Sequence, residues 1–79
     1  MDLQNKTITE LAGVIAWDWP TIPPSAKAYL APMFSLYDIT DNYYEDSGRS
    51  VILHFLTNAS TWKGDVAREV KKELNRRLK

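Results

Sequence analysis

Apolar residues recur at helical spacing from Thr7 to Trp19, and this pattern predicts a first helix. With about 100° of rotation per residue, one face of the segment is apolar: Ile8, Leu11, Ala12, Ile15 and Trp19. Thr7 and Glu10 stand at the spacing of a capping box, in which each side chain satisfies a backbone N–H at the helix start. Because Pro20 disfavours helical geometry at Trp19, we expect the helix to end there or one residue earlier.

A second helix is predicted from Pro23 and Pro24, since proline is tolerated in a first turn, to about Tyr37. Its apolar side is made of aromatic and long aliphatic residues: Tyr29, Leu30, Met33, Phe34, Leu36 and Tyr37. Pro32 lies inside this segment and removes the backbone hydrogen bond to the carbonyl of Ala28. We therefore expect a kink or an early break at Pro32.

A third helix is predicted from roughly Gly48 to Ala59, with Asp46 or Ser47 as its N-cap. Its apolar residues cover more than half of the helical wheel: Val51, Ile52, Leu53, Phe55, Leu56 and Ala59. Such breadth is typical of a central, deeply buried helix. A strand is the alternative for residues 51–56, but the sequence shows no second run of strand-forming residues that could pair with it.

A fourth helix is predicted from Trp62 to about Leu78, with Thr61 as its N-cap and Ser60 as the alternative. Its apolar residues repeat every four positions: Trp62, Val66, Val70, Leu74 and Leu78. Gly64, early in this helix, costs about 1 kcal/mol relative to alanine. We expect crowding by Trp62 or by a neighbouring helix to explain the glycine.

Four helices with short connections predict an all-α fold, a compact bundle in which residues 1–79 form one monomeric domain. Cysteine is absent, which excludes disulfides and thiolate sites. The first residues are acidic and polar, unlike a signal peptide, and no apolar run is long enough to span a membrane. We therefore expect a cytoplasmic protein that does not enter membranes.

The charged residues are sorted by position along the chain. Residues 60–79 hold seven cations and three anions, whereas residues 1–59 hold three cations and seven anions, so the net charge of zero hides a strong dipole. Such a layout suits docking onto a polyanion or docking between like chains, and it also serves solubility alone.

The sequence lacks the parts of an enzyme. His54 is the only histidine, and it falls on the polar side of its predicted helix, where a structural role is expected. The segment from residue 38 to residue 47 is acidic and predicts a loop, with Tyr43 and Tyr44 folding back onto the body. Its carboxylates do not have the spacing of a calcium-binding loop: Asp38, Asp41, Glu45 and Asp46. We predict no catalytic site, no cofactor and no metal.

Cations gather on one face of the fourth helix, opposite its apolar band. We take five of them as a candidate nucleic-acid or partner face: Arg68, Lys71, Lys72, Arg76 and Arg77. Lysine and arginine contacts to phosphates supply most nonspecific affinity for nucleic acids. The third and fourth helices could form a helix-turn-helix, although the start of the fourth helix lacks the usual polar readers. A merely solvated face is the favoured alternative.

Aromatic and small residues indicate a candidate protein interface. Trp17 lies opposite the apolar face of its own helix, so it is either covered by another segment or exposed, and we expect burial within the monomer. The outer face of the second helix is small and uncharged, with Ala28, Ala31 and Ser35. Exposed tryptophan and tyrosine are enriched at protein interfaces.

Three short motifs follow the third helix: Trp62-Lys63-Gly64-Asp65, Ala67-Arg68 and Lys72-Glu73-Leu74. With the preceding apolar helix, they resemble the C-terminal part of short uncharacterised proteins found in bacteria and in their phages and mobile elements. The resemblance covers less than half of the chain, implies a bacterial or phage origin, and implies no activity. The sequence thus predicts a small, non-enzymatic protein-protein interaction module or a self-associating one. The alternative is a nucleic-acid binder that uses the basic C-terminal helix.

Overall fold

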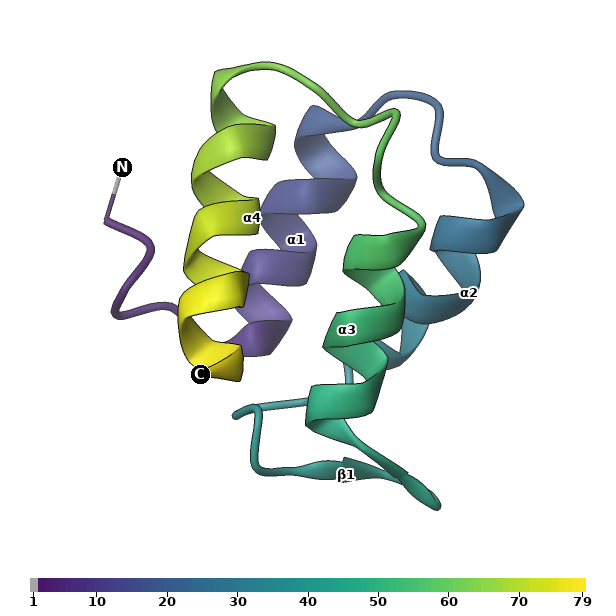
Figure 1. Ribbon diagram of the computed structural model, residues 1–79, viewed down its shortest axis with the longest axis vertical. Coiled ribbons are helices and arrows are strands. Elements are labelled where there is room, and N and C mark those ends of the chain that lie inside the picture. The colour runs from purple at the N-terminus through teal and green to yellow at the C-terminus, as the bar shows by residue number, and fades with distance from the viewer. Residues whose placement is uncertain (1) are drawn as a thin grey trace.

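The computed structural model describes residues 2–79, which fold into a bundle of helices with one small sheet (Figure 1). The elements are α1 (Ile8–Asp18), α2 (Pro24–Met33), β1 (Asn42–Tyr43), β2 (Asp46–Ser47), α3 (Gly48–Thr57) and α4 (Asp65–Leu78). The two strands are antiparallel and pair as a hairpin between α2 and α3. The prediction of four helices is confirmed, but the hairpin means that the fold is mostly helical rather than purely all-α.

Helix α1 begins and ends where its local signals place it. The Thr7 hydroxyl accepts from the Glu10 N–H at 3.0 Å, and the Glu10 carboxylate accepts from the Thr7 N–H at 2.8 Å, which completes the predicted capping box. The helix ends at Asp18, which is one of the two predicted end points. Its apolar face is fully buried against α2 and α4: Ile8, Leu11, Ala12 and Ile15.

Helix α2 is shorter than its apolar pattern suggests. It ends at Met33 rather than Tyr37, directly after Pro32, so the expected early break is confirmed and the expected extension is wrong. The chain then turns across the start of α1, where the Thr9 hydroxyl donates to the Leu36 carbonyl at 2.6 Å. This bond satisfies a carbonyl that a continued helix would have paired internally.

The hairpin packs against the start of α3 through a close backbone contact. The Gly48 N–H donates to the Asp41 carbonyl at 2.7 Å. A Cβ at Gly48 would lie 2.6 Å from the Ile39 carbonyl oxygen, so only glycine fits this position. Ser47, one of the two predicted caps, accepts from the Ser50 N–H at 3.1 Å and starts the helix.

Helix α3 packs most extensively against α2 and also touches α4 and the hairpin. Val51, Ile52 and Phe55 form its buried face, as the apolar pattern predicts. Leu53 is 55% exposed, however, so the inference that the whole apolar arc is buried is wrong.

Helix α4 begins at Asp65, three residues after the predicted start, and neither Thr61 nor Ser60 caps it. Trp62 lies in the preceding loop, where it is buried against other helices. Gly64 is the N-cap, with φ of +113°, and a Cβ there would meet nothing within 4 Å. The expected crowding is therefore wrong, and the glycine is required by its backbone conformation.

No helix within residues 2–79 combines the length and the apolar character that crossing a membrane would need.

Candidate interaction surfaces

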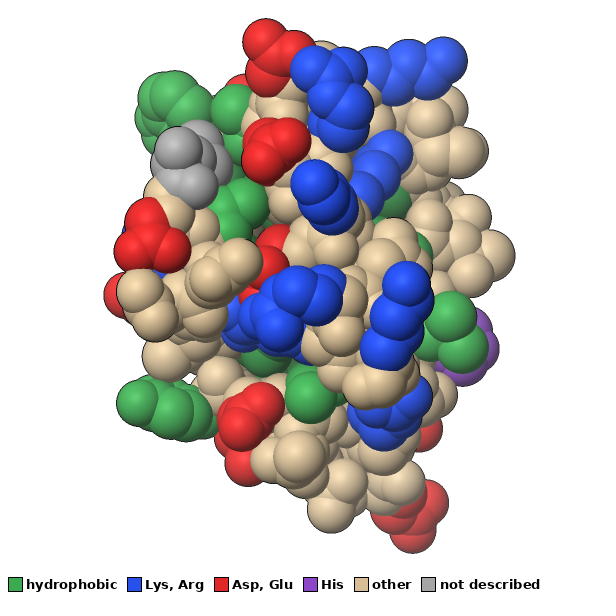
Figure 2. Space-filling model, turned by 60° about the vertical axis from the view of Figure 1, so that its left-hand side comes forward, with side chains coloured by type: hydrophobic (Ala, Val, Ile, Leu, Met, Phe, Trp, Pro, Cys, Tyr) green, Lys and Arg blue, Asp and Glu red, His purple; other side chains and the backbone are tan. Residues whose placement is uncertain are grey.

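Lysine and arginine side chains form a band over α4, interrupted by carboxylates (Figure 2). Arg68, Lys72 and Arg76 are exposed, as the helical wheel predicts. Two of them are already engaged: Arg68 pairs with Asp65, and Arg76 pairs with Glu73. Lys72 alone among the five predicted cations is exposed without an ion pair in the part of the chain that the structure describes.

Lys71 is half-buried and has a structural contact. Its Nζ donates to the Trp62 carbonyl at 2.6 Å and lies 5.9 Å from the centroid of the Trp62 ring. Desolvation, with a smaller repulsion from Lys63, lowers the pKa of the Lys71 ammonium below its ordinary value. Lys71 therefore holds the loop before α4 rather than standing free for a phosphate.

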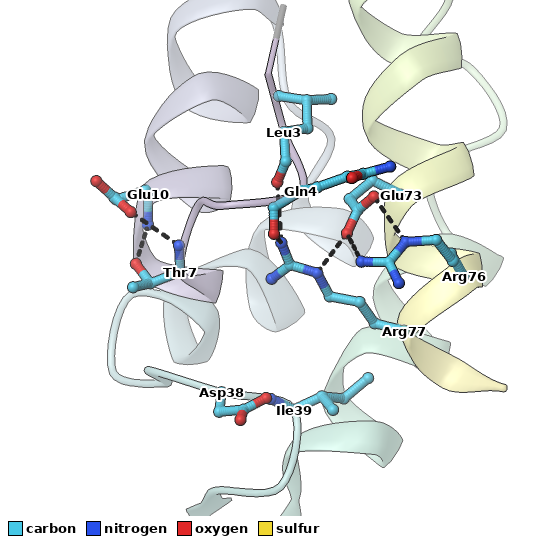
Figure 3. Close-up of polar contacts among 9 residues, drawn as sticks. All are labelled: Leu3, Gln4, Thr7, Glu10, Asp38, Ile39, Glu73, Arg76 and Arg77. Carbon is cyan, nitrogen blue, oxygen red and sulfur yellow. Dashed lines mark hydrogen bonds and ion pairs between the residues drawn. The ribbon is translucent and has the colours of Figure 1, made fainter.

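Arg77 is turned into the molecule and binds the N-terminal segment (Figure 3). Its Nη2 donates to the Leu3 carbonyl at 2.9 Å and the Gln4 carbonyl at 3.2 Å, while its Nε donates to Glu73 at 2.6 Å. With its side chain only 12% exposed, Arg77 does not belong to the predicted basic face. The assignment of Arg77 to this face is therefore corrected. The helical wheel of α4 does not reveal that residues 3 and 4 cover this side of the helix.

Glu73 is the centre of this clasp, although it is not among the site residues predicted from the sequence. It is 6% exposed, and Arg76 reaches both of its carboxylate oxygens, at 3.0 and 2.5 Å. The hydrogen bond from Arg76 is the main cause that lowers the pKa of Glu73, with Arg77 adding to it and burial opposing it. Glu73 stands three residues before Arg76 and four before Arg77, and this spacing in the sequence is typical of ion pairs along a helix.

The connection between α3 and α4 does not have helix-turn-helix dimensions. It covers residues 58–64, whereas the turn of that motif has about three to four residues. The first turns of α4 expose Asp65 and Glu69, which would repel DNA phosphates at the point where a recognition helix enters the groove.

Trp17 is 80% exposed, so the expected burial within the monomer is wrong. The physical reason is its position on α1: α2 and α4 pack around the opposite face, and the hairpin with its tyrosines lies at the other end of the molecule (Figure 1). Gly13 and Ala16 on the same helix are also exposed, which leaves the indole standing on an open surface.

All three positions predicted for the outer face of the second helix are exposed: Ala28 and Ala31 lie on α2, whereas Ser35 follows the end of α2 at Met33. Ala28 also borders a groove of about 370 Å³ between α2, α3 and the hairpin, which we call the tyrosine groove. Its lining combines aromatic, small and polar residues: Ala28, Tyr29, Pro32, Tyr43, Asp46, Ser50, Val51 and His54. Trp17 is not part of this lining, so the predicted interface residues belong to two separate surfaces.

His54 forms one wall of the tyrosine groove together with Tyr29. The two rings stack with centroids 5.1 Å apart and planes inclined by 19°. His54 Nδ1 lies 2.7 Å from the Ser50 carbonyl oxygen, which only accepts, so Nδ1 carries the hydrogen of this bond. In the neutral ring this leaves Nε2 as an acceptor, and the predicted structural histidine thus also presents a polar atom.

Tyr44 occupies the tip of the hairpin in a strained conformation. Its φ is +55°, and among residues 2–79 no other residue except glycine has a positive φ. A two-residue turn with a positive φ only at its first central position is of type II′, which favours glycine there. The Tyr44 side chain is 87% exposed, and its ring meets Tyr43 edge to face at 4.7 Å. Tyr43 folds back as expected, whereas Tyr44 does not.

Among residues 2–79, no three histidine, aspartate or glutamate side chains cluster closely enough to hold a metal ion.

Comparison with known proteins gives no match to a family model, to a curated protein or to a solved structure.

Proposed function

We propose that this chain is a small, non-enzymatic protein-binding module that contacts its partner through the tyrosine groove and the adjoining outer face of α2. The observation that carries this proposal is the continuity of the two surfaces at Ala28, which is exposed on α2 and also lines the groove. Aromatic groups, which dominate the energetics of interfaces, line the groove, and the α2 face next to it has small side chains that let another backbone approach closely.

The strained tip of the hairpin supports the same role. A bulky residue held at a positive φ costs roughly 1–3 kcal/mol, and such strain is concentrated at functional sites. Tyr44 makes little use of its ring within the monomer, since most of the side chain is exposed. If a partner covers this ring, Tyr44 contributes to binding, which explains a strained residue that contributes little to folding.

Site-specific photo-crosslinking tests the proposal. A photoreactive amino acid replaces Ala28 in the full chain, which is expressed in its native host, and the same amino acid at the exposed Glu69 on α4 serves as the control. We expect a discrete cross-linked protein from position 28 that the Tyr43→Ala variant loses. Equal cross-linking from both positions, or none from position 28, contradicts the proposal.

A cross-linker at Trp17 decides whether the second exposed surface takes part. Capture of the same protein from positions 17 and 28 would mean that one partner wraps around α1 and α2.

The bacterial or phage origin that the C-terminal motifs imply stays a prediction, as does the nucleic-acid alternative.

A further inference from the structure

Building on the protein-binding role proposed above, we infer that the tyrosine groove receives an arginine side chain of the partner protein, with lysine as the weaker substitute. The first support is charge. Asp46 is the only charged residue in the lining, so no cation opposes an incoming positive group. Glu45, which precedes Asp46 in the turn of the hairpin, adds a second exposed carboxylate.

The cations nearest in sequence do not neutralise this acidic end. Arg49, which follows β2 closely, is directed away and donates to the Leu78 carbonyl at the end of α4. Lys27 on α2 is exposed and is not part of the groove lining. Asp46 and Glu45 have no ion pair within residues 2–79, which leaves both carboxylates available to a partner.

The shape of the groove suits one long side chain rather than a larger ligand. Its volume of about 370 Å³ lies at the lower end of the range for small-molecule pockets. Tyr29 and His54, whose rings stack on each other, both line the groove, and a planar guanidinium group stacks well on aromatic side chains. The methylene groups of an arginine stem would pack along Tyr43, as long cationic side chains do on apolar surfaces.

The polar atoms of the groove match the same occupant. A guanidinium group only donates hydrogen bonds, and it offers five N–H groups. The groove presents an acceptor in the Asp46 carboxylate, and Nε2 of His54, another lining residue, accepts when the ring is neutral. A carboxylate-bearing or phosphate-bearing ligand would meet a like charge at Asp46 and no compensating cation.

A second copy of this chain is the competing occupant, because α4 carries exposed cations such as Lys72. We favour a different protein for a geometrical reason. A contact between the hairpin end of one copy and α4 of the next joins unlike surfaces, and contacts of this kind generate rings or open chains rather than a closed pair. The exposed Asp65 and Glu69 on α4 would also face the acidic hairpin in that arrangement.

The test is a titration of the ¹⁵N-labelled full chain, followed by nuclear magnetic resonance, with the peptide acetyl-Gly-Arg-Gly-amide. The same peptide with citrulline, a neutral isostere of arginine, is the control. We expect shifts centred on Tyr29, Asp46 and His54, with weaker binding of citrulline. Asp46→Asn should weaken binding by up to about fivefold, the upper end for an exposed ion pair. Glu45→Gln, outside the groove lining, should have a smaller effect.

A second variant keeps the test independent of the hairpin. Ser50→Phe fills the groove from α3 while leaving Asp46 in place, and it should abolish the shifts at His54. Equal binding of the arginine and citrulline peptides, or shifts scattered over acidic sites such as Glu69, would overturn the inference. Concentration-dependent sedimentation that Asp46→Asn abolishes would also overturn it, in favour of a second copy.

The outcomes separate this inference from the binding role on which it rests. Cross-linking from position 28 without groove shifts would leave the protein-binding role standing and reject the arginine. Groove shifts without any cross-linked protein would reject the protein-binding role. They would also reject the inference that the groove receives an arginine of a partner protein.

Discussion

The indole rings of Trp19 and Trp62 stack almost in parallel, with centroids 5.6 Å apart and planes inclined by 11°. Trp19 follows the end of α1, whereas Trp62 precedes the start of α4, so the pair joins two distant parts of the chain. Trp19 also meets Phe55 of α3 edge to face at 6.4 Å, and the Trp62 Nε1 donates to Asp18 at 3.0 Å. This cluster fixes three helices to one another at the same end of the bundle.

We expect Trp62→Ala to cost about 3–5 kcal/mol of unfolding free energy, because it removes a buried aromatic ring and leaves a cavity. Trp62→Phe keeps much of the packing but leaves the Asp18 carboxylate without its indole donor, and it should cost about 1–3 kcal/mol. Urea unfolding followed by far-ultraviolet circular dichroism measures both values. If Trp62→Phe is as stable as the unmodified chain, the hydrogen bond to Asp18 makes no net contribution to stability.

The sequence predicts best where signals are local. Helix α1 was delimited by a capping box at Thr7 and by Pro20, both of which act within a few residues. The break of α2 at Pro32 follows from a missing N–H and needs no knowledge of the rest of the fold.

The errors arise where distant residues decide the local structure. Trp62 continues the four-residue spacing of α4, yet its stack on Trp19 holds it in a loop and delays the helix to Asp65. The β-hairpin escaped prediction because its turn, with Tyr44 at the first central position, lacks the glycine that normally reveals such turns. The number of free cations on α4 was overestimated, because Arg77 binds the carbonyls of residues 3 and 4. This contact joins the two ends of the chain, so a helical wheel of α4 alone does not reveal it.

Two glycines of this chain should respond to alanine in opposite directions. Gly64→Ala forces an L-residue to adopt a φ of +113° and should cost roughly 1–3 kcal/mol, although the new methyl group has space. Gly13→Ala, at an exposed position of α1, should stabilise the protein by about 0.5–1 kcal/mol. Thermal unfolding of both variants checks the pair, and a stabilising Gly64→Ala would mean that α4 starts without the strained cap.

The ion-paired Glu73 should make stability depend on acid pH. Because its pKa in the folded state lies below the ordinary value of 4.5, the contribution of Glu73 is complete above pH 4.5 and is lost as the pH falls through the folded pKa. Glu73→Gln should therefore lower stability at pH 7, by about 2 kcal/mol, and reduce the further loss between pH 7 and pH 3. Urea midpoints at the two pH values measure this effect.

Two further variants serve as controls for Glu73. Glu69→Gln, an exposed change on the same helix, should leave the pH dependence nearly unchanged. Glu10→Gln should remove a separate part of it, because the hydrogen bond from the Thr7 backbone, opposed by partial desolvation, lowers the pKa of Glu10. A Glu73→Gln profile parallel to that of the unmodified chain would show that the clasp with Arg76 and Arg77 makes no net contribution.

Tyr44 should show opposite effects on stability and on binding. Tyr44→Gly relieves a positive φ at the position where a type II′ turn favours glycine, and we expect a gain of up to about 1 kcal/mol after the entropic cost of glycine. The same change removes an exposed ring beside the tyrosine groove and should reduce cross-linking from position 28. Thermal unfolding and cross-linking yield are measured on one preparation, and loss of both stability and binding would assign Tyr44 an ordinary packing role.

The basic band on α4 should bind duplex DNA weakly. If all five predicted cations contacted phosphates, the slope of log affinity against log salt would be about −4.5. Arg77 and Lys71 are held by backbone carbonyls, and Arg68 and Arg76 would have to give up their pairs with Asp65 and Glu73. We therefore expect a slope between about −1 and −2, measured by fluorescence anisotropy from 50 to 200 mM salt. The triple variant in which Arg68, Lys72 and Arg76 become alanine is the matched comparison. A slope near −4 that this variant loses would mean that the cations leave their internal partners for phosphate, and the nucleic-acid alternative would then replace the protein-binding proposal.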